Sequence, residues 1–216
     1  MNATEINASN TTANKSQHAL GLQITGLYVQ RGMHLVINGL SHQQQPGDIY
    51  CLTGPNGAGK STLLRTIAKR LPVADGQISV PVPVVYVGHN DGLSGSISGR
   101  ENLKGWAKIN GFPCLSSIID NALASFAATD FADIETYRLS RGQRRRLALT
   151  RLSLAPANSL WLLDEPNTSL DQATNERLDE VVIAHAEGGG MVLAATHLDF
   201  AVAASPQIII LPGRLK

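Results

Sequence analysis

The chain has 216 residues, of which 43% are hydrophobic, enough for one domain with a sizeable buried core. It carries 18 Lys and Arg against 17 Asp and Glu, a net charge of +1. This balance argues against a general nucleic-acid binder, which needs a basic surface to release counterions from phosphates. Charged residues make up 16% of the chain, well under the average of about 25%. Either uncharged polar residues supply the surface, or a partner covers part of it.

Three further features exclude other classes. The longest apolar runs, such as 160–163 and 208–211, are far shorter than the roughly 20 residues of a membrane-spanning helix, so we expect the chain not to span a bilayer. Cys51 and Cys114 lie far apart without a CxxC motif, which argues against a disulfide or metal framework and favours a reducing setting. Residues 1–20 are rich in Asn, Thr and Ser with no apolar core, which predicts a disordered polar tail rather than a secretory signal.

From residue 22 onward, short apolar stretches bounded by Gly and Pro alternate with stretches of helical spacing. The pattern predicts strands at 22–31, 34–42, 49–53, 82–87, 160–163, 191–196 and 208–211, the first two forming a hairpin around Gly32. It predicts helices at 60–69, 99–110, 116–128, 147–154 and 172–186, and a loop at 72–76. Strands alternating with helices indicate an α/β fold with a mainly parallel sheet. We expect one domain over 21–216, with a small helical insertion at about 92–139.

A glycine-rich stretch separates the strand at 49–53 from the helix at 60–69. It is Gly54-Pro55-Asn56-Gly57-Ala58-Gly59-Lys60-Ser61, followed by Thr62, and fits G-x-x-x-x-G-K-[ST]. The glycines allow a tight loop whose backbone N–H groups point at phosphate oxygens, and the helix adds its positive N-terminal end. We expect Lys60 to reach the β- and γ-phosphates of a nucleotide and Ser61 to ligate Mg²⁺. The alternative, a glycine-rich turn without a ligand, is disfavoured by the strand before the loop and the helix after it.

Two carboxylates, Asp164 and Glu165, follow the apolar strand at 160–163. Sheets of α/β proteins bind their ligands at the carboxyl ends of strands. At such a position Asp164 can hold Mg²⁺, directly or through water, and Glu165 can orient and deprotonate an attacking water. Two solvated acids in a turn before Pro166 are the alternative, and the phosphate loop upstream makes it the weaker one.

A helix start at 139–143 has two interpretations. Ser140 and Gln143 match a capping box, which is the structural explanation. A helix N-terminus with Gly142 and a free hydroxyl is also an anion site. The basic run at 144–146 follows directly, and because the chain as a whole is not basic, this run favours structural or phosphate-proximal roles.

His197 follows the strand at 191–196. A histidine at a strand end is often incidental to function. In a parallel sheet, however, this strand end points to the same edge as Asp164. His197 is therefore a candidate catalytic residue, beside Glu165 and Lys60.

Together these motifs resemble the ATP-binding subunits of ABC transporters, over nearly all of the chain from residue 22. The resemblance covers the phosphate loop, the signature at 139–143, the acidic pair, a D-loop at 169–171 and a switch histidine at His197. It implies a P-loop ATPase of ABC type with an N-terminal antiparallel β part, and ATP and Mg²⁺ as cofactors. It also implies a head-to-tail homodimer, in which Ser140, Gly142 and Gln143 contact the nucleotide bound by the other chain. Asp171 would lie at the dimer interface, and His197 would help hold the γ-phosphate and the water.

Three positions depart from the usual pattern of that family. His89 stands where the family usually has glutamine after the second core strand, and Arg141 stands in the signature where glycine is commonest. Arg31 aligns with the aromatic residue that usually stacks on adenine, and its guanidinium plane could still stack on the base. We expect His89 to take the place of the glutamine near Mg²⁺ and the coupling surface.

Within the family, these departures and the segments 144–152, 160–166, 189–192 and 196–197 resemble the ATP-binding subunit of the haem exporter used in c-type cytochrome maturation. That resemblance implies an ATPase acting with integral membrane subunits, at the cytoplasmic face of the bacterial inner membrane, to release haem-loaded chaperone. No haem-ligating constellation is evident in the sequence, so partners would handle the haem. The alternatives are an ABC exporter of another substrate and a soluble ABC-type ATPase acting on ribosomes or DNA. A small non-ABC kinase is disfavoured by the Ser140 segment and His197.

Overall fold

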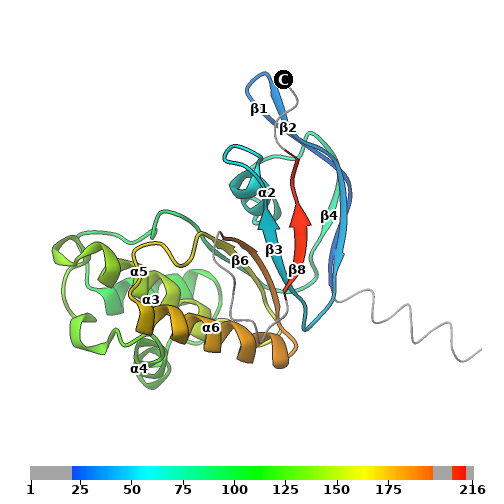
Figure 1. Cartoon of the computed structure of the whole chain (residues 1–216). Helices are drawn as coiled ribbons and strands as arrows, with labels where there is room; N and C mark the ends of the chain where they lie inside the picture. The colour runs from blue at the N-terminus through cyan, green and yellow to red at the C-terminus, as the bar shows by residue number, and fades with distance from the viewer. Residues whose placement is uncertain (1–20, 197–205, 213–216) are drawn as a thin grey trace, which may run out of the picture.

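The computed structural model describes residues 21–196 and 206–212. The predicted tail at 1–20 and the candidate His197 lie outside the described residues. Figure 1 shows two lobes: one holds the two-sheet part around α2, and the other holds the helices α3, α4 and α5. The helix α6 runs along the base, from the helical lobe toward the sheets.

A three-stranded antiparallel sheet forms the N-terminal part. The central strand β1 (Leu22–Arg31) pairs with β2 (His34–Gln44) on one side and with β4 (Asp75–Ser79) on the other. The predicted hairpin is confirmed, and Gly32 at its tip has a φ of +60°. The strand β4 corrects the prediction of a loop at 72–76. Asp75 and Gly76 are typical turn residues, but the second edge of β1 supplies backbone partners that override this local preference.

The second sheet has five strands in the order β5-β6-β7-β3-β8, and every neighbouring pair is parallel. These strands are β3 (Ile49–Thr53), β5 (Val84–Val87), β6 (Leu160–Asp164), β7 (Met191–Ala195) and β8 (Gln207–Ile210). The prediction of an α/β fold with a mainly parallel sheet is confirmed. Because the strands run in one direction, the segments that follow β3, β5, β6 and β7 leave the sheet at the same edge.

The helices are α2 (Lys60–Ile67), α3 (Gly99–Ile109), α4 (Ser116–Ser125), α5 (Arg141–Thr150) and α6 (Gln172–Glu187). Short 3₁₀ turns occupy Thr129–Phe131, Thr136–Arg138 and Leu152–Leu154. The helix predicted at 116–128 stops at Ser125, and Ala127 has the left-handed φ of +49° that ends it. The predicted helical stretch 147–154 is the second half of α5 and a 3₁₀ turn. Over the described ranges, no helix has the length and apolarity needed to cross a membrane.

Both faces of the parallel sheet are buried. Along β6, Leu160 and Leu162 pack into a core with α2 and β1, whereas Trp161 and Leu163 pack into a second core with α5 and α6. This alternation follows from the two-residue period of a strand, and it explains why β6 stays apolar until Asp164. A third core fills the helical lobe. The helix α5 joins the cores, because Leu147 packs in the third and Leu149 in the second.

Gly190, which precedes β7, provides a test of this packing. It lies against His185 of α6, whose ring stacks on Trp161 with ring centroids 3.6 Å apart. A Cβ at Gly190 would overlap the imidazole, so we expect Gly190→Ala to lower the free energy of unfolding by about 1–3 kcal/mol in urea denaturation. Gly105, exposed in α3 with open space around it, is the control. Gly105→Ala should be neutral or stabilise by up to about 1 kcal/mol, and equal losses in both variants would contradict this packing.

Candidate functional site

The glycine-rich loop lies between β3 and α2, and its shape requires glycine at two positions. Gly54 and Gly59 have φ values of +137° and +103°, a region that side chains disfavour. A Cβ on Gly59 would lie 2.8 Å from Cγ1 of Val36, and one on Gly54 would overlap the carbonyl oxygen of Leu211. The loop therefore fits tightly between β2 and the segment after β8, which hold it in place.

Lys60 begins α2 and closes the loop. Its Nζ donates hydrogen bonds to the carbonyl oxygens of Gly54 at 2.7 Å and Pro55 at 3.2 Å, and the residue is 9% exposed. The residue before it, Gly59, offers no side-chain cap to the helix. The first N–H groups of α2 thus receive no side-chain cap from Gly59. These N–H groups and the Lys60 ammonium beside them can bind an anion.

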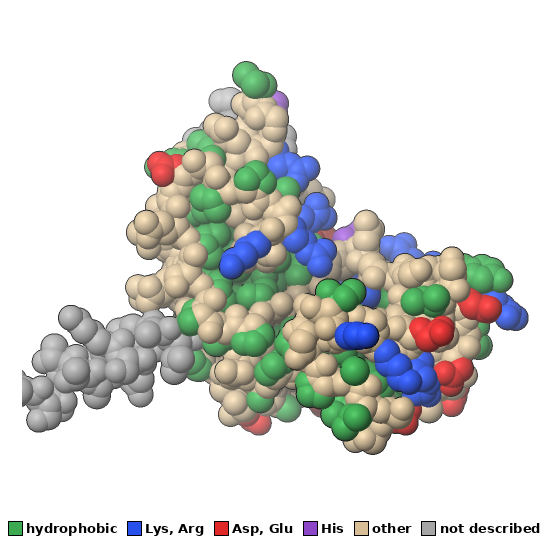
Figure 2. Space-filling view, turned by 180° about the vertical axis from the view of Figure 1, so that it is seen from behind, with side chains coloured by type: hydrophobic (Ala, Val, Ile, Leu, Met, Phe, Trp, Pro, Cys, Tyr) green, Lys and Arg blue, Asp and Glu red, His purple; other side chains and the backbone are tan. Residues whose placement is uncertain are grey.

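The loop opens on a polar cleft of about 380 Å³. Six of its residues line this cleft, namely Asn56, Gly57, Gly59, Lys60, Ser61 and Thr62. The remaining lining comes from Arg31, Val36, Arg65 and Glu165. Figure 2 shows Lys and Arg side chains on the lobe of the two sheets, beside the notch between the lobes. The fold thus brings Arg31 and Glu165 to the phosphate loop, although each lies far from it in the sequence.

Asp164, at the end of β6, is 2% exposed and is hydrogen-bonded through both carboxylate oxygens. The Ser61 hydroxyl donates to Oδ1 at 2.8 Å, so the two predicted metal ligands are in contact. The Tyr86 hydroxyl donates to Oδ2 at 3.2 Å and accepts a hydrogen bond from Nε of Arg65 at 3.3 Å. Burial raises the pKa of Tyr86, so its hydroxyl keeps the proton that it donates. The motifs in the sequence did not single out Tyr86, although a hydroxyl in the otherwise aliphatic strand β5 is a signal for a buried partner.

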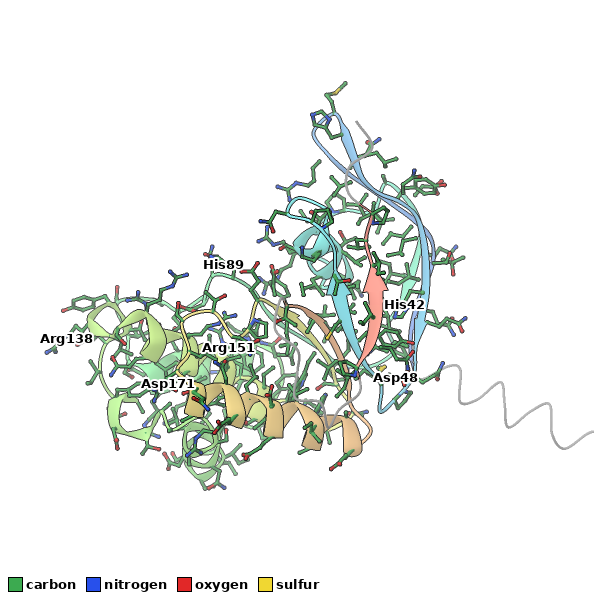
Figure 3. All side chains as sticks on the ribbon, in the orientation of Figure 1. His42, Asp48, His89, Arg138, Arg151 and Asp171 are labelled. Carbon is green, nitrogen blue, oxygen red and sulfur yellow. The ribbon has the colours of Figure 1, made fainter. Side chains whose placement is uncertain are left out.

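Glu165 follows with a left-handed backbone, at φ +50°. Its N–H donates to the carbonyl oxygen of Ala195 at 2.8 Å, and its side chain is 42% exposed. Its Oε2 lies 3.7 Å from Nδ1 of His89. His89 follows β5 in the segment that runs toward the helical lobe (Figure 3). The two residues come from adjacent strand ends, because β5 pairs with β6. His89 is therefore placed beside the predicted general base.

Arg145 is a residue of the site whose role the sequence did not reveal. Its side chain is 3% exposed and donates to the carbonyl oxygens of Gly88 at 2.6 Å, Glu165 at 2.7 Å and Pro166 at 3.0 Å. In the sequence Arg145 is one of three arginines in the basic run at 144–146, but its neighbour Arg146 pairs with an exposed carboxylate instead. The available signal was its spacing: it lies four residues before the buried Leu149, on the same helix face.

The signature segment forms the capping box that the sequence predicted. The backbone N–H of Gln143 donates to Oγ of Ser140 at 3.2 Å, and the backbone N–H of Ser140 donates to Oε1 of Gln143 at 2.9 Å. Gly142 lies against the 169–171 segment, since a Cβ on it would be 3.1 Å from the carbonyl oxygen of Ser169. Asp171 caps α6 through the N–H of Thr174 at 2.9 Å and pairs with Arg146 at 2.6 Å.

The fold does not bring the signature to the phosphate loop of its own chain. Among the described residues that line the phosphate-loop cleft, none comes from 139–143. The two helices concerned, α2 and α5, belong to different lobes (Figure 1). The sites at the starts of α2 and α5 are thus separate within one chain.

Comparisons with known proteins agree on one family. The family model described as "ABC transporter" matches residues 37–168. The chain is 44% identical over 179 residues to the cytochrome c biogenesis ATP-binding export protein CcmA of Ruegeria pomeroyi, covering 82% of this chain and 85% of that one. It is 40% identical over 198 residues to the CcmA of Cereibacter sphaeroides, covering 91% and 92%. A solved putative ABC transporter ATP-binding protein from Pyrococcus furiosus has the same fold, with a TM-score of 0.76, 24% identity, and coverage of 88% and 97%.

The hydrogen bond from Tyr86 to Asp164 should contribute to the stability of the fold. We expect Tyr86→Phe to lower the free energy of unfolding by about 1–2 kcal/mol, because the variant leaves one oxygen of a buried carboxylate without its donor. Tyr137→Phe is the control, since Tyr137 is 68% exposed and its change should be within about 0.5 kcal/mol. Urea denaturation of both variants measures the difference, and a neutral Tyr86→Phe would contradict the contact.

Proposed function

The chain belongs to the ABC transporter family and, within it, to the cytochrome c biogenesis ATP-binding export proteins called CcmA, and we propose that it powers release of haem-loaded chaperone through membrane partners. As a member of this family it is an ATP-binding subunit and an ATPase. The observation that carries the mechanism is the meeting of the phosphate loop, Asp164, Glu165 and His89 at one edge of the parallel sheet.

Binding of ATP begins with the phosphates. The Nζ of Lys60 exchanges its bonds to the carbonyls of Gly54 and Pro55 for the β- and γ-phosphate oxygens. The loop N–H groups and the start of α2 surround the same oxygens. Arg31 lines the same cleft, and in this proposal its guanidinium plane would stack on adenine.

Ser61 and Asp164 fit a Mg²⁺ site, because a hydroxyl and a buried carboxylate already in contact are oxygen ligands of the hard type that Mg²⁺ prefers. When bound, Mg²⁺ supplies positive charge that neutralises the phosphate oxygens. Glu165, on the cleft lining, accepts the proton of the attacking water. His89 lies beside that carboxylate, with its Nδ1 3.7 Å from Oε2 of Glu165. His197 comes two residues after the end of β7 in the sequence, and we retain it as the group that helps hold the γ-phosphate.

Each chain holds only half of an ATP site in this proposal. Ser140, Gly142 and Gln143 lie away from the phosphate-loop cleft of their own chain, so a head-to-tail homodimer is needed to bring them to a nucleotide. The cap at Ser140 uses the hydroxyl oxygen as an acceptor, and its hydrogen can still be donated to a phosphate. Asp171, exposed at the start of α6, would lie near the dimer interface.

Membrane subunits complete the proposal. Two curated CcmA relatives carry the words "cytochrome c biogenesis ATP-binding export protein" in their names, and the chain covers most of their length. We therefore place this chain at the cytoplasmic face of the bacterial inner membrane, bound to integral membrane proteins of cytochrome c maturation. The low charged fraction of 16% agrees with a surface covered by partners.

Two substitutions separate binding from hydrolysis. We expect Lys60→Ala to lose ATP binding, because the phosphates lose their cation. Glu165→Gln should keep ATP binding, lower hydrolysis at least about 100-fold and accumulate an ATP-bound dimer in size-exclusion chromatography. Glu187→Gln, at the far end of α6, is the control and should hydrolyse ATP normally. Normal ATP hydrolysis by Glu165→Gln would contradict the assignment of Glu165 as the general base. If this variant stays monomeric at saturating ATP, the ATP site shared between two chains is contradicted.

The partners are tested by isolating the chain from bacterial membranes in mild detergent and identifying the proteins that accompany it. We expect integral membrane proteins of cytochrome c maturation, in amounts that survive a high-salt wash. Recovery of lipid- or peptide-exporter subunits would indicate another transported substrate. Recovery of ribosomes would overturn the proposal.

A further inference from the structure

We propose that Arg145 is a positioning residue for ATP hydrolysis, which holds the backbone of Glu165 and the backbone before His89 at a fixed separation. This inference rests on the function proposed above. It concerns a side chain that touches neither the phosphate loop nor the cleft in front of it, because the described lining of that cleft does not include Arg145.

The first observation is where the ladder between β5 and β6 ends. The last residues that β5 and β6 pair with each other are Val87 and Leu163, and beyond them β6 continues to pair only with β7, at Asp164 and Ala195. Arg145 spans this gap. One of its terminal nitrogens, Nη1, donates to the carbonyl oxygen of Gly88 at 2.6 Å, and the other, Nη2, donates to that of Glu165 at 2.7 Å.

The second observation is the backbone of Glu165, whose φ of +50° is unfavourable for a residue with a side chain. Such a conformation persists only where its surroundings hold it. The N–H of Glu165 is bound to Ala195 and its carbonyl is bound to Arg145. Nε of Arg145 also fixes the next carbonyl, that of Pro166, at 3.0 Å. The guanidinium thus holds the two consecutive peptide groups that follow the Cα from which the Glu165 carboxylate projects.

The third observation is the chemistry of the guanidinium. Its planar fork carries five N–H donors on three nitrogens, so it can bind carbonyls from two strand ends over a wider span than the single nitrogen of an ammonium. Burial is the main cause that lowers the pKa of Arg145 from its ordinary value, and the nearby Asp91, with Oδ1 at 3.6 Å, opposes that effect. A buried cation is costly unless its donors are satisfied, and beside the ion pair with Asp91 the carbonyls of Gly88, Glu165 and Pro166 satisfy them.

The hydrogen bonds of Arg145 help to set the 3.7 Å distance between Nδ1 of His89 and Oε2 of Glu165. His89 is the residue after Gly88, and both backbones are held by the same guanidinium. Without the Arg145 guanidinium, His89 and Glu165 keep their imidazole and carboxylate groups, but the distance between these groups is no longer fixed. A displacement of about 1 Å in a catalytic group can lower a rate by about 100-fold, while substrate binding is unaffected.

Two near-isosteric variants isolate the hydrogen bonds. Arg145→Met removes all donors, and Arg145→Gln retains an amide with two donors. In the full chain purified with its membrane partners, we expect Arg145→Met to lower kcat about 10- to 100-fold, with the KM for ATP changed less than about threefold. Arg145→Gln should retain clearly more of kcat than Arg145→Met, because it can still bind one or two of the carbonyls.

Arg151 supplies the matched control. It is also buried, and burial lowers its pKa to about 10, but it donates to the carbonyl oxygens of Asp91 at 2.8 Å and Gly92 at 2.7 Å. Arg151→Met should lower the melting temperature as much as Arg145→Met does, yet leave kcat within about twofold. An equal loss of kcat in both variants would show that any buried arginine of this region is merely structural, and would overturn the proposal. So would failure of both Arg145 variants to fold.

A double variant separates this inference from the proposed function. In a Glu165→Gln background there is no base left to position, so adding Arg145→Met should change the residual single-turnover rate less than about twofold. If Glu165→Gln itself hydrolyses ATP normally, the proposed function fails. If Glu165→Gln is inactive but Arg145→Met keeps the full kcat, or if the double variant loses a further large factor, the proposed function stands and the positioning role is overturned.

Discussion

The direction of five parallel strands is the constraint on which the rest of the structure depends. Both faces of that sheet are covered, so polar groups can enter only where a strand ends. The loop after β3, His89 after β5 and Glu165 after β6 therefore reach one edge. Asp164 is the one acid among the described residues of the parallel ladder, and donors to both of its oxygens compensate its burial.

The helix α5 links that edge to the second lobe. Its start carries the signature with Ser140, proposed to serve the nucleotide of another chain. Just over one turn later, Arg145 binds the carbonyl of this chain's own Glu165. Leu147 and Leu149 then anchor the helix in two different cores. One helix therefore connects the signature segment, the backbone of Glu165 and two of the three cores.

The sequence predicted the elements with strong local signals and missed one that lacked them. The phosphate loop, β6 and the capping box at Ser140 follow from residue types at fixed spacing, and the fold has them where the pattern placed them. The strand β4 was missed because its two starting residues favour a turn, and only pairing with β1 makes them extended. Tyr86 and Arg145 escaped notice for a similar reason, because their partners lie 78 and 20 residues away in the sequence.

By itself, the sequence determined which chemical groups stand at the loop and at the strand ends: glycines with a lysine, a serine, two acids and a histidine in place of glutamine. These are local properties, set by residue identity and by the two-residue period of buried strands. Only the tertiary structure decided that Ser61 contacts Asp164, that His89 lies 3.7 Å from Glu165, and that Arg145 is buried while Arg146 is partly exposed. Those outcomes depend on strand order and on which helix face is covered, and both are set by packing between segments far apart in the chain.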